Sequence, residues 1–407
     1  MATGTFVSLA LPNYRKFFAG QAVSLTGTWI QSVAMAWLIL EISGSATSIG
    51  LAVAFQFLPV LVFGPYGGVL VDRFRKRKLL LITQSLAGLQ AALLAVLVLT
   101  KHASIGLVLA LSLMLGFIYV LDMPARQAFV REMVPPELVR NAVSLNSVVI
   151  NGARIVGPAV AGVMIATIGL GWCFAVNAAS FVAVIAAYAS MKGELLLPSE
   201  QVDRAPGQLR EGLRYVWRTP DLRVPLIMMS VVGMLAYEFQ VVLPAFTSET
   251  FHGDAFSFGV ISAAMGVGAV IGGLISATRQ SSGIKAIAMA SAVFGLSILV
   301  TALMPSVIWA AIAMVPVGAA SIWFTSAGNS AVQLHTDPQM RGRVMSLWTV
   351  AFIGSTPIGA PIVGWIAETA GPRWALGVGA AAALGAGLYG ARWAARMHRL
   401  PAVAPAV

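Results

Sequence analysis

The chain of 407 residues contains little charge, one cysteine and four histidines. Charged residues make up 10% of it, whereas soluble domains carry roughly 25%, so polar groups could not cover a water-facing surface. The single cysteine, Cys173, excludes an intrachain disulfide and a cysteine-based metal cluster. The histidines are scattered, and no metal-ligand spacing, phosphate-binding loop or nucleophile–base set is visible. We therefore expect no cofactor and no enzyme activity, with a polytopic membrane enzyme kept as the alternative from another class.

The N-terminus lacks the small-residue cleavage site that ends a signal peptide. Its first apolar run is also interrupted by Gln21, Ser24 and Gln31. We expect this run to be a retained first membrane span.

Long apolar runs dominate the rest of the sequence, which is 58% hydrophobic. Twelve runs have about 20 residues or more, enough to cross roughly 30 Å of hydrocarbon as a helix. They lie near 17–41, 48–71, 79–100, 105–123, 142–168, 171–191, 223–247, 256–278, 285–304, 306–332, 343–369 and 372–396. Backbone groups in lipid must be paired internally. The sequence therefore predicts an all-α integral membrane protein with twelve transmembrane helices.

The basic residues are distributed unevenly between the two sides of these spans. Only Lys101 and Arg373 fall in the loops of one side, and Arg154 falls inside a span. Because basic loops stay in the cytoplasm, we expect both termini to be cytoplasmic in a multi-pass protein of the inner (plasma) membrane. This distribution accounts for the net charge of +11 without a nucleic-acid partner.

One long polar connection, residues 192–222, separates six spans from six. It predicts an N-terminal six-helix bundle over 1–191 and a C-terminal one over 223–407. Within the connection a helix is expected, with apolar residues on one face and basic residues every four positions: Leu209, Leu213, Val216 and Trp217, then Arg210, Arg214 and Arg218. Such a helix either lies on the anionic inner leaflet or is a solvated linker, and the sequence leaves both open.

An internal repeat supports the division into two halves. Residues 152–162 read GARIVGPAVAG and residues 354–364 read GSTPIGAPIVG. The glycines align at one constant offset: Gly152 with Gly354, Gly157 with Gly359, and Gly162 with Gly364. The pattern predicts two six-span bundles of parallel topology.

The turn between the second and third spans carries the strongest motif. Residues 67–78 read GGVLVDRFRKRK, with a glycine pair, one acid and five basic residues between two apolar runs. Glycines allow neighbouring helices to approach closely, and the basic residues hold the turn in the cytoplasm. A short charged hairpin of this kind is typical of a transporter gate.

This turn resembles the signature loop of the major facilitator superfamily, G-x-L-x-D-R-x-G-[RK]-[RK], with Arg75 where that pattern has glycine. The resemblance extends over essentially the whole chain. The strings NYRKFFAGQAVSLTGTWIQSVAMAWLIL at 13–40, LDMPARQAFV at 121–130 and LNSVVINGARIVGPAVAG at 145–162 resemble the drug- and siderophore-efflux branch of that superfamily.

The resemblance implies alternating access between two bundles and proton-coupled export of small amphipathic molecules such as drugs, siderophores or other metabolites. A facilitator or importer of a small solute is the alternative within transport. We expect a small-molecule substrate, protons as the coupling ion, a surrounding lipid bilayer, and a monomer.

Gating residues are expected at the end of the second span and the foot of the fourth. They are Gly68, Asp72, Arg73, Asp122 and Arg126. Contacts that form in one state and break in the other would involve Asp72 with the start of the eleventh span, near Arg343, as the resemblance implies. Arg73 would bind Asp122 or Glu132.

Two charges lie deep inside spans, where a charge must face protein, water or an opposite charge. Arg154, with its neighbour Asn151, lies in the fifth span, and Glu238 lies in the seventh. Our hypothesis is that Glu238 takes up and releases the coupling proton with Arg154 as its partner. The alternative is a carboxyl bonded to neighbouring hydroxyl groups.

Polar and aromatic residues at helical spacing are candidates for a substrate cavity. They are Gln21, Ser24, Thr28 and Gln31 in the first span, with Tyr119, Tyr237, Trp323, Thr325 and Asn329 in later spans. Small residues and a proline are candidates for the interface between the bundles: Gly157, Pro158, Gly268, Gly272 and Gly359. Glu41 and Glu368 close spans on the outer side, and we expect both to be solvated.

Overall fold

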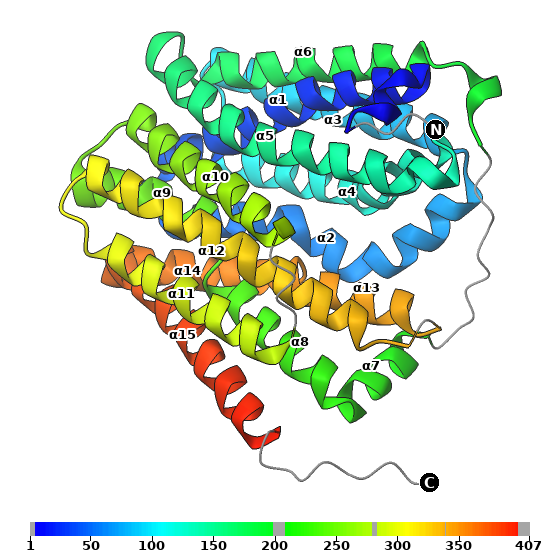
Figure 1. Cartoon of the computed structure of the whole chain (residues 1–407). Helices are drawn as coiled ribbons and strands as arrows, with labels where there is room; N and C mark the ends of the chain where they lie inside the picture. The colour runs from blue at the N-terminus through cyan, green and yellow to red at the C-terminus, as the bar shows by residue number, and fades with distance from the viewer. Residues whose placement is uncertain (1–4, 198–207, 279–282, 338, 398–407) are drawn as a thin grey trace, which may run out of the picture.

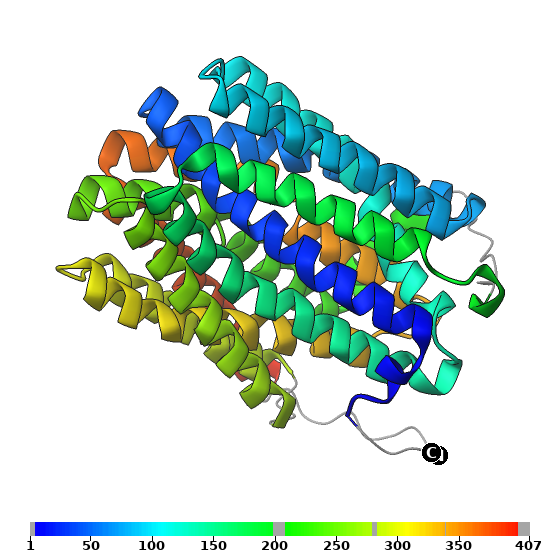
Figure 2. The ribbon, with the colours of Figure 1, turned by 90° about the horizontal axis from the view of Figure 1, so that it is seen from above.

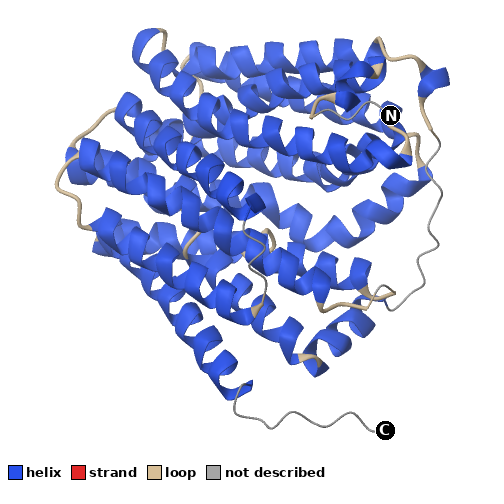
Figure 3. Ribbon diagram, viewed as in Figure 1, coloured by secondary structure: helices blue, strands red, loops and turns tan. Residues whose placement is uncertain are grey.

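The computed structural model describes residues 5–197, 208–278, 283–337 and 339–397 (Figure 1). Residues 198–207 of the expected linker lie outside the described residues. Within the described ranges every regular element is helical and no strand occurs (Figure 3).

The N-terminal half consists of six long helices and three short 3₁₀ turns. They are η1 (Val7–Ala10), α1 (Pro12–Ser43), α2 (Ala46–Arg73), α3 (Lys76–Leu99), α4 (Ile105–Glu132), η2 (Pro136–Leu138), α5 (Val139–Thr167), α6 (Leu170–Ala189) and η3 (Gly193–Leu195).

The C-terminal half begins with the linker helix α7 (Gln208–Arg218). It continues with α8 (Pro220–Leu235), α9 (Phe239–Ala245), the π-helical turn η4 (Phe246–Thr250), α10 (Ala255–Thr278), α11 (Ile284–Ala302), α12 (Val307–Leu334), α13 (Arg341–Phe352), α14 (Thr356–Ala370) and α15 (Pro372–Met397). Twelve helical segments of the described chain are long and apolar enough to cross a membrane, which confirms the predicted spans.

Two spans expected to be continuous are interrupted. The seventh breaks between α8 and α9, at residues 236–238, and the eleventh breaks between α13 and α14, at residues 353–355. The second break precedes Pro357, which lacks an N–H group and constrains the residue before it. At the first break the carbonyl of Glu238 accepts the N–H groups of Val241 and Val242, so the new helix start is partly satisfied.

Each half forms a bundle of six spans, and two helix pairs make most of the contact between the bundles. In the N-terminal bundle α1 packs on α5 and α6, and α3 packs on α4 and α6. In the C-terminal bundle α10 packs on α12, and α11 packs on α12 and α15. The seam consists chiefly of α2 against α14 and α5 against α10. In Figure 2 the α1, α5 and α6 helices lie in front of the C-terminal helices.

We call the two ends of the molecule the linker end and the distal end, after the connections that each contains. The linker end contains the α2–α3 turn, the α4–α5 connection and α7; the distal end contains the α1–α2, α3–α4 and α14–α15 connections. The distal end lies at the left of Figure 1.

Candidate functional site

The break in the seventh span places a carboxyl group in the interior of the membrane domain. Glu238 is 5% exposed, and its Oε1 is buried with no hydrogen-bond partner among the described residues. Thr356, in the first turn of α14, lies beside this carboxyl group. An acid at this depth, with an unsatisfied oxygen, is costly to maintain and is a candidate for function.

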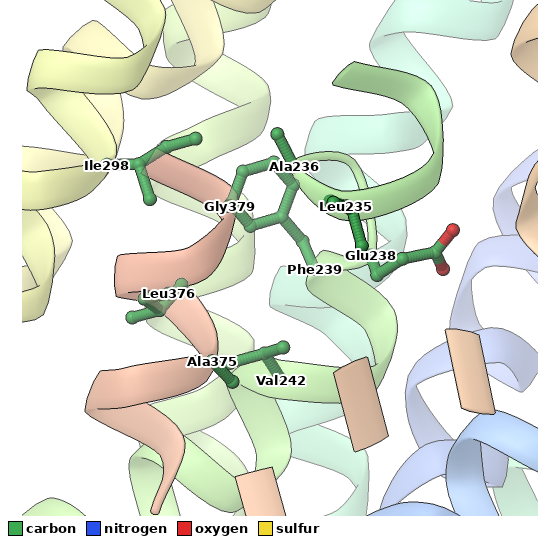
Figure 4. Close-up of a pocket in the computed structure, with 9 residues that line it drawn as sticks. All are labelled: Leu235, Ala236, Glu238, Phe239, Val242, Ile298, Ala375, Leu376 and Gly379. Carbon is green, nitrogen blue, oxygen red and sulfur yellow. The ribbon is translucent and has the colours of Figure 1, made fainter. Parts of the chain in front are cut away.

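A small cavity of about 10 Å³ lies beside this break. Apart from Glu238 its lining is apolar: Leu235, Ala236, Phe239, Val242, Ile298, Ala375, Leu376 and Gly379. Figure 4 shows the Glu238 carboxyl pointing away from these side chains. The apolar cluster therefore supports the backbone at the break, and the carboxyl is directed elsewhere.

Arg154 does not form the expected ion pair with Glu238. Among the described residues its guanidinium instead lies over the ring of Trp29, 5.6 Å from the ring centroid. Tyr237, the neighbour of Glu238, lies close to Arg154 across the seam. One turn earlier, the Asn151 amide donates to the carbonyl of Ser147 at 2.8 Å. Arg154 and the helix break thus face the same region between the bundles, without a direct bond.

Tyr237 connects this region to α12 and α13. Its hydroxyl donates to the carbonyl of Ser321 at 2.6 Å, and its ring packs on Phe294 and Phe352 with centroids 5.1 Å away in each case. Of the other candidates on α12, Trp323 is half-buried. The Thr325 hydroxyl also donates to Ser321, at 3.0 Å, and the Asn329 side chain accepts from Gln333.

The polar stripe of α1 lies inside the N-terminal bundle, not on the wall of a cavity. Gln21 donates to the Tyr188 hydroxyl at 2.7 Å, and Gln31 donates to Gln90 at 3.1 Å while accepting from Asn177 at 2.8 Å. These bonds fasten α1 to α3 and α6. In the same stripe Ser24 is 4% exposed, and the Thr28 hydroxyl bonds the Ser24 carbonyl.

Asp122 and Arg126 form the centre of a second buried polar network. The Asp122 carboxylate accepts from Thr83 and Gln84, each at 2.7 Å, and pairs with Arg126. Arg126 also donates to Gln21 at 3.2 Å. Tyr119 lies beside this pair. The network joins α1, α3 and α4 near the linker end, so these residues are coupled to one another.

The partners expected for Arg73 are therefore already engaged. Asp122 binds Arg126, and Glu132 pairs with Lys76 at 3.8 Å. Arg73 is exposed at the end of α2, and Asp72 is half-buried beside it. Gly68 lies one turn before Asp72, and the neighbouring Gly67 packs against the Val120 backbone of α4.

Contacts across the seam concentrate toward the distal end. A side chain at Gly50 would collide with the backbone of Ala360 and Pro361, and one at Gly364 would meet the Ala46 carbonyl. Gly259 of α10 touches the Gly162 backbone of α5. Small residues thus bring the backbones of the two bundles into direct contact.

A polar contact closes the same end. The Glu368 carboxylate of α14 accepts the Ser45 hydroxyl and, at 3.1 Å, the Thr47 backbone N–H, at the start of α2. Glu368 is exposed, as expected of an outer acid, but it bonds across the bundles. Glu41, by contrast, accepts from Trp37 of its own helix at 2.8 Å.

Most of the residues predicted for the seam make their closest contacts inside one bundle. Gly157 faces Trp29 of α1, Gly359 faces Met234 of α8, and Gly268 and Gly272 face α12. Pro158 does lie at the seam, because its carbonyl is next to Gly259. Spacing identified close helix contacts correctly, but it did not identify the partner helix.

The sequence did not indicate the seam contacts of Gly50 and Gly259, nor the bond of Glu368 across the bundles. Gly364 was available as a member of the internal repeat, although its role at the seam was not inferred. Nothing in the local sequence around Glu368 distinguishes a solvated acid from one that caps a helix of the other bundle.

Two bundles of six spans joined along a seam, with buried charges between them, define a membrane transporter of the major facilitator type. The model of the transmembrane secretion effector family matches residues 3–404. The chain belongs to this family, within the major facilitator superfamily. Because the members are transporters, the alternative of a membrane enzyme is dropped.

Similar proteins agree with this assignment. The enterobactin exporter EntS of Shigella flexneri is 26% identical over 93% of this chain and 89% of its own length. EntS of Escherichia coli O81 is 25% identical over the same shares.

Solved structures share the fold. A mutant of the peptide transporter POT has a TM-score of 0.76 at 15% identity, covering 95% of each chain. A bacterial homologue of the iron transporter ferroportin, in an inward-facing state, has a TM-score of 0.74 at 14% identity, covering 94% of this chain and 99% of its own.

Proposed function

We propose that this transporter exports small amphipathic molecules, siderophores or drugs among them, in exchange for protons, by alternating access between its two bundles. The linker end faces the cytoplasm in this proposal, in agreement with the basic residues gathered there. The bundles then correspond to residues 1–191 and 223–407, with both termini cytoplasmic, and the chain works as a monomer.

The difference between the two ends of the seam is the observation on which alternating access rests. Gly50, Gly364 and Glu368 bind the bundles together at the distal end. At the linker end α13 packs on α7, α8 and α12 of its own half, and its ribbon diverges from α2 (Figure 1). This arrangement fits an inward-facing state, which is also the state of the ferroportin homologue.

Glu238 is the proposed proton carrier. Its buried oxygen has no partner among the described residues, and it lies at a helix break, where small backbone changes re-aim a side chain. Arg154 lies across the seam and would influence the carboxyl differently as the bundles tilt. The coupled gate would include Asp122, Arg126, Asp72, Arg73 and Gly68.

Export and cargo class are supported by the relatives, which are enterobactin exporters. Tyr119, Trp323 and Tyr237 would supply flat contact area to an amphipathic cargo, and Thr325 and Asn329 would supply hydrogen bonds. In this proposal the α1 stripe stabilises the bundle and does not contact cargo.

The test uses inverted vesicles, with candidate siderophores or drugs added to the medium outside them. Uptake into the vesicles is measured with and without an imposed proton gradient. We expect accumulation that depends on the gradient, and Glu238→Gln to fold normally while losing the dependence entirely. Gradient-independent equilibration would identify a facilitator, and gradient-driven loss of cargo from vesicles preloaded with it would identify an importer. Unchanged coupling in Glu238→Gln would remove that residue from the mechanism.

A further inference from the structure

The outward face of α7 carries apolar and basic side chains that no part of the described chain covers. Leu213 and Trp217 are 53% and 62% exposed. Arg214 and Arg218 are exposed beside them, one helical turn apart. The inward face is occupied: Val216 is buried, and the Tyr215 hydroxyl bonds Asp337 at 2.9 Å. α7 is thus fixed to the protein on one side and presents a Trp–Arg surface on the other.

A third arginine is held between two tryptophans at the same place. The Arg223 guanidinium lies 5.8 Å from the Trp217 ring centroid and 5.6 Å from that of Trp393 on α15. The indole Nε1 of Trp393 is buried and has no hydrogen-bond partner among the described residues. One guanidinium nitrogen, Nη1, donates a long hydrogen bond of 3.5 Å to the Trp217 carbonyl. Stacking holds the planar guanidinium in position, and its other N–H groups can bind an oxyanion.

The surroundings are strongly basic. Arg392 and Arg396 are exposed on the last turns of α15, which packs on α8. The nearby acids are Asp221, which is half-buried in the first turn of α8, Glu211, which is engaged with Arg343 at 2.6 Å, and the exposed Asp337, which accepts the Tyr215 hydroxyl at 2.9 Å. An anion is therefore favoured over a cation.

The position of this surface selects a lipid as the occupant. Arg223 lies in the first turn of the candidate membrane span Pro220–Thr250, and Arg396 ends the span Pro372–Arg396, so the cluster lies at the depth of lipid headgroups. Exposed leucine and tryptophan side chains beside arginines suit the boundary between headgroups and acyl chains. We propose that α7 and the adjoining ends of α8 and α15 bind the headgroup of an anionic phospholipid. Arg214, Arg218 and Arg223 contact its phosphate, and Leu213 and Trp217 contact its acyl region.

This site has a consequence for the gate. Two other residues of α7, Glu211 and Tyr215, bind Arg343 and Asp337 around the start of α13. A lipid bound on the outer face would hold α7, and with it the linker end of the eleventh span.

The test measures phosphatidylglycerol retained by the full-length protein in neutral detergent, by native mass spectrometry, with phosphatidylcholine as the neutral lipid. Each arginine near the headgroup is worth about fivefold in affinity. The variant R214Q/R218Q/R223Q is therefore expected to bind phosphatidylglycerol roughly a hundredfold more weakly. The control R75Q/R131Q/R140Q removes the same charge from exposed positions at the linker end of the other bundle, and should retain wild-type binding.

Two single variants keep the test informative if the triple variant is unstable. Arg223→Lys keeps the charge but loses the stacked geometry, and Trp217→Leu keeps apolar area but loses the ring; each should weaken binding about two- to fivefold. Equal loss in the triple variant and its control would overturn the proposal, as would equal retention of phosphatidylcholine. Competition by soluble glycerol phosphate at matched concentration would also overturn it, because the site would then bind a free anion.

Discussion

The two ends of the seam between the bundles are built from different chemistry. At the distal end, glycine and alanine bring the backbones of α2 and α14 into contact, and one exposed acid, Glu368, bonds the start of α2. At the linker end, three ion pairs of the described residues lie within one bundle or involve the linker helix: Asp122 with Arg126, Lys76 with Glu132, and Glu211 with Arg343.

The difference indicates that close packing and ion pairs respond differently when the bundles move. Close backbone contact is lost as soon as two helices separate, so it defines a closed state sharply. Charged pairs within one bundle survive a rigid-body movement, because their partners move together. The distal end is therefore the end expected to change most when the bundles tilt.

The largest effect should come from breaking the buried pair at the linker end. Arg126→Met leaves the Asp122 carboxylate, which is 1% exposed, without its counter-charge, at a cost of about 3–5 kcal/mol. The measurement is thermal or denaturant unfolding in detergent. The double variant D122N/R126M should recover most of the loss, and a single variant as stable as wild type would show that the pair is not structural.

Next in size is a steric block of distal closure. Gly50→Leu places a side chain against the backbone of Ala360 and Pro361, which cannot yield easily. Overpacking of this kind costs about 1–3 kcal/mol. Here it destabilises only the state in which the distal end is closed. We expect cargo transport to fall at least tenfold, while Gly106→Leu, which meets nothing within 4 Å, transports normally. Equal rates would mean that the α2–α14 contact is not needed.

A smaller effect is expected at the polar contact of the same end. Glu368→Gln keeps the acceptor oxygen for Ser45 and Thr47 but loses its charge. Because Glu368 is exposed, solvent screening limits the cost to about 0.5 kcal/mol, a shift of roughly twofold toward the open distal state. Labelling rates at distal cysteines measure it. Glu41→Gln, whose acid bonds its own helix, is the matched control and should change nothing.

The smallest effect concerns pH at the distal end. The backbone N–H and hydroxyl of Ser257 bond the Asp254 carboxylate and hold its pKa below the usual range. Asp254 therefore contributes stability above the usual carboxyl pKa, and this is lost as pH falls through its lowered value. Melting temperature followed from neutral to acid pH should decline less steeply in Asp254→Asn. Superimposed curves would show that these bonds contribute nothing.

The spans and their number could be predicted because each apolar run is long enough to cross the hydrocarbon core as a helix. The surroundings of a polar stripe could not be predicted. Gln21 and Gln31 share one side of α1, but periodicity does not say whether that side meets a cavity or α6. The break at Glu238 was equally hidden, since no proline or glycine occupies residues 236–238. The Glu368 contact joins residues 321 positions apart in the chain, and only the fold brings them together.

The most direct test of the two-end account is a pair of distances measured by electron paramagnetic resonance between spin labels. Cys173→Ala removes the only cysteine, and labels then go to exposed positions 42 and 369 at the distal end, or 140 and 341 at the linker end. On adding cargo and lowering the pH, the distal distance should lengthen while the linker distance shortens. Distances that lengthen together, or that stay fixed during active transport, would contradict alternating access.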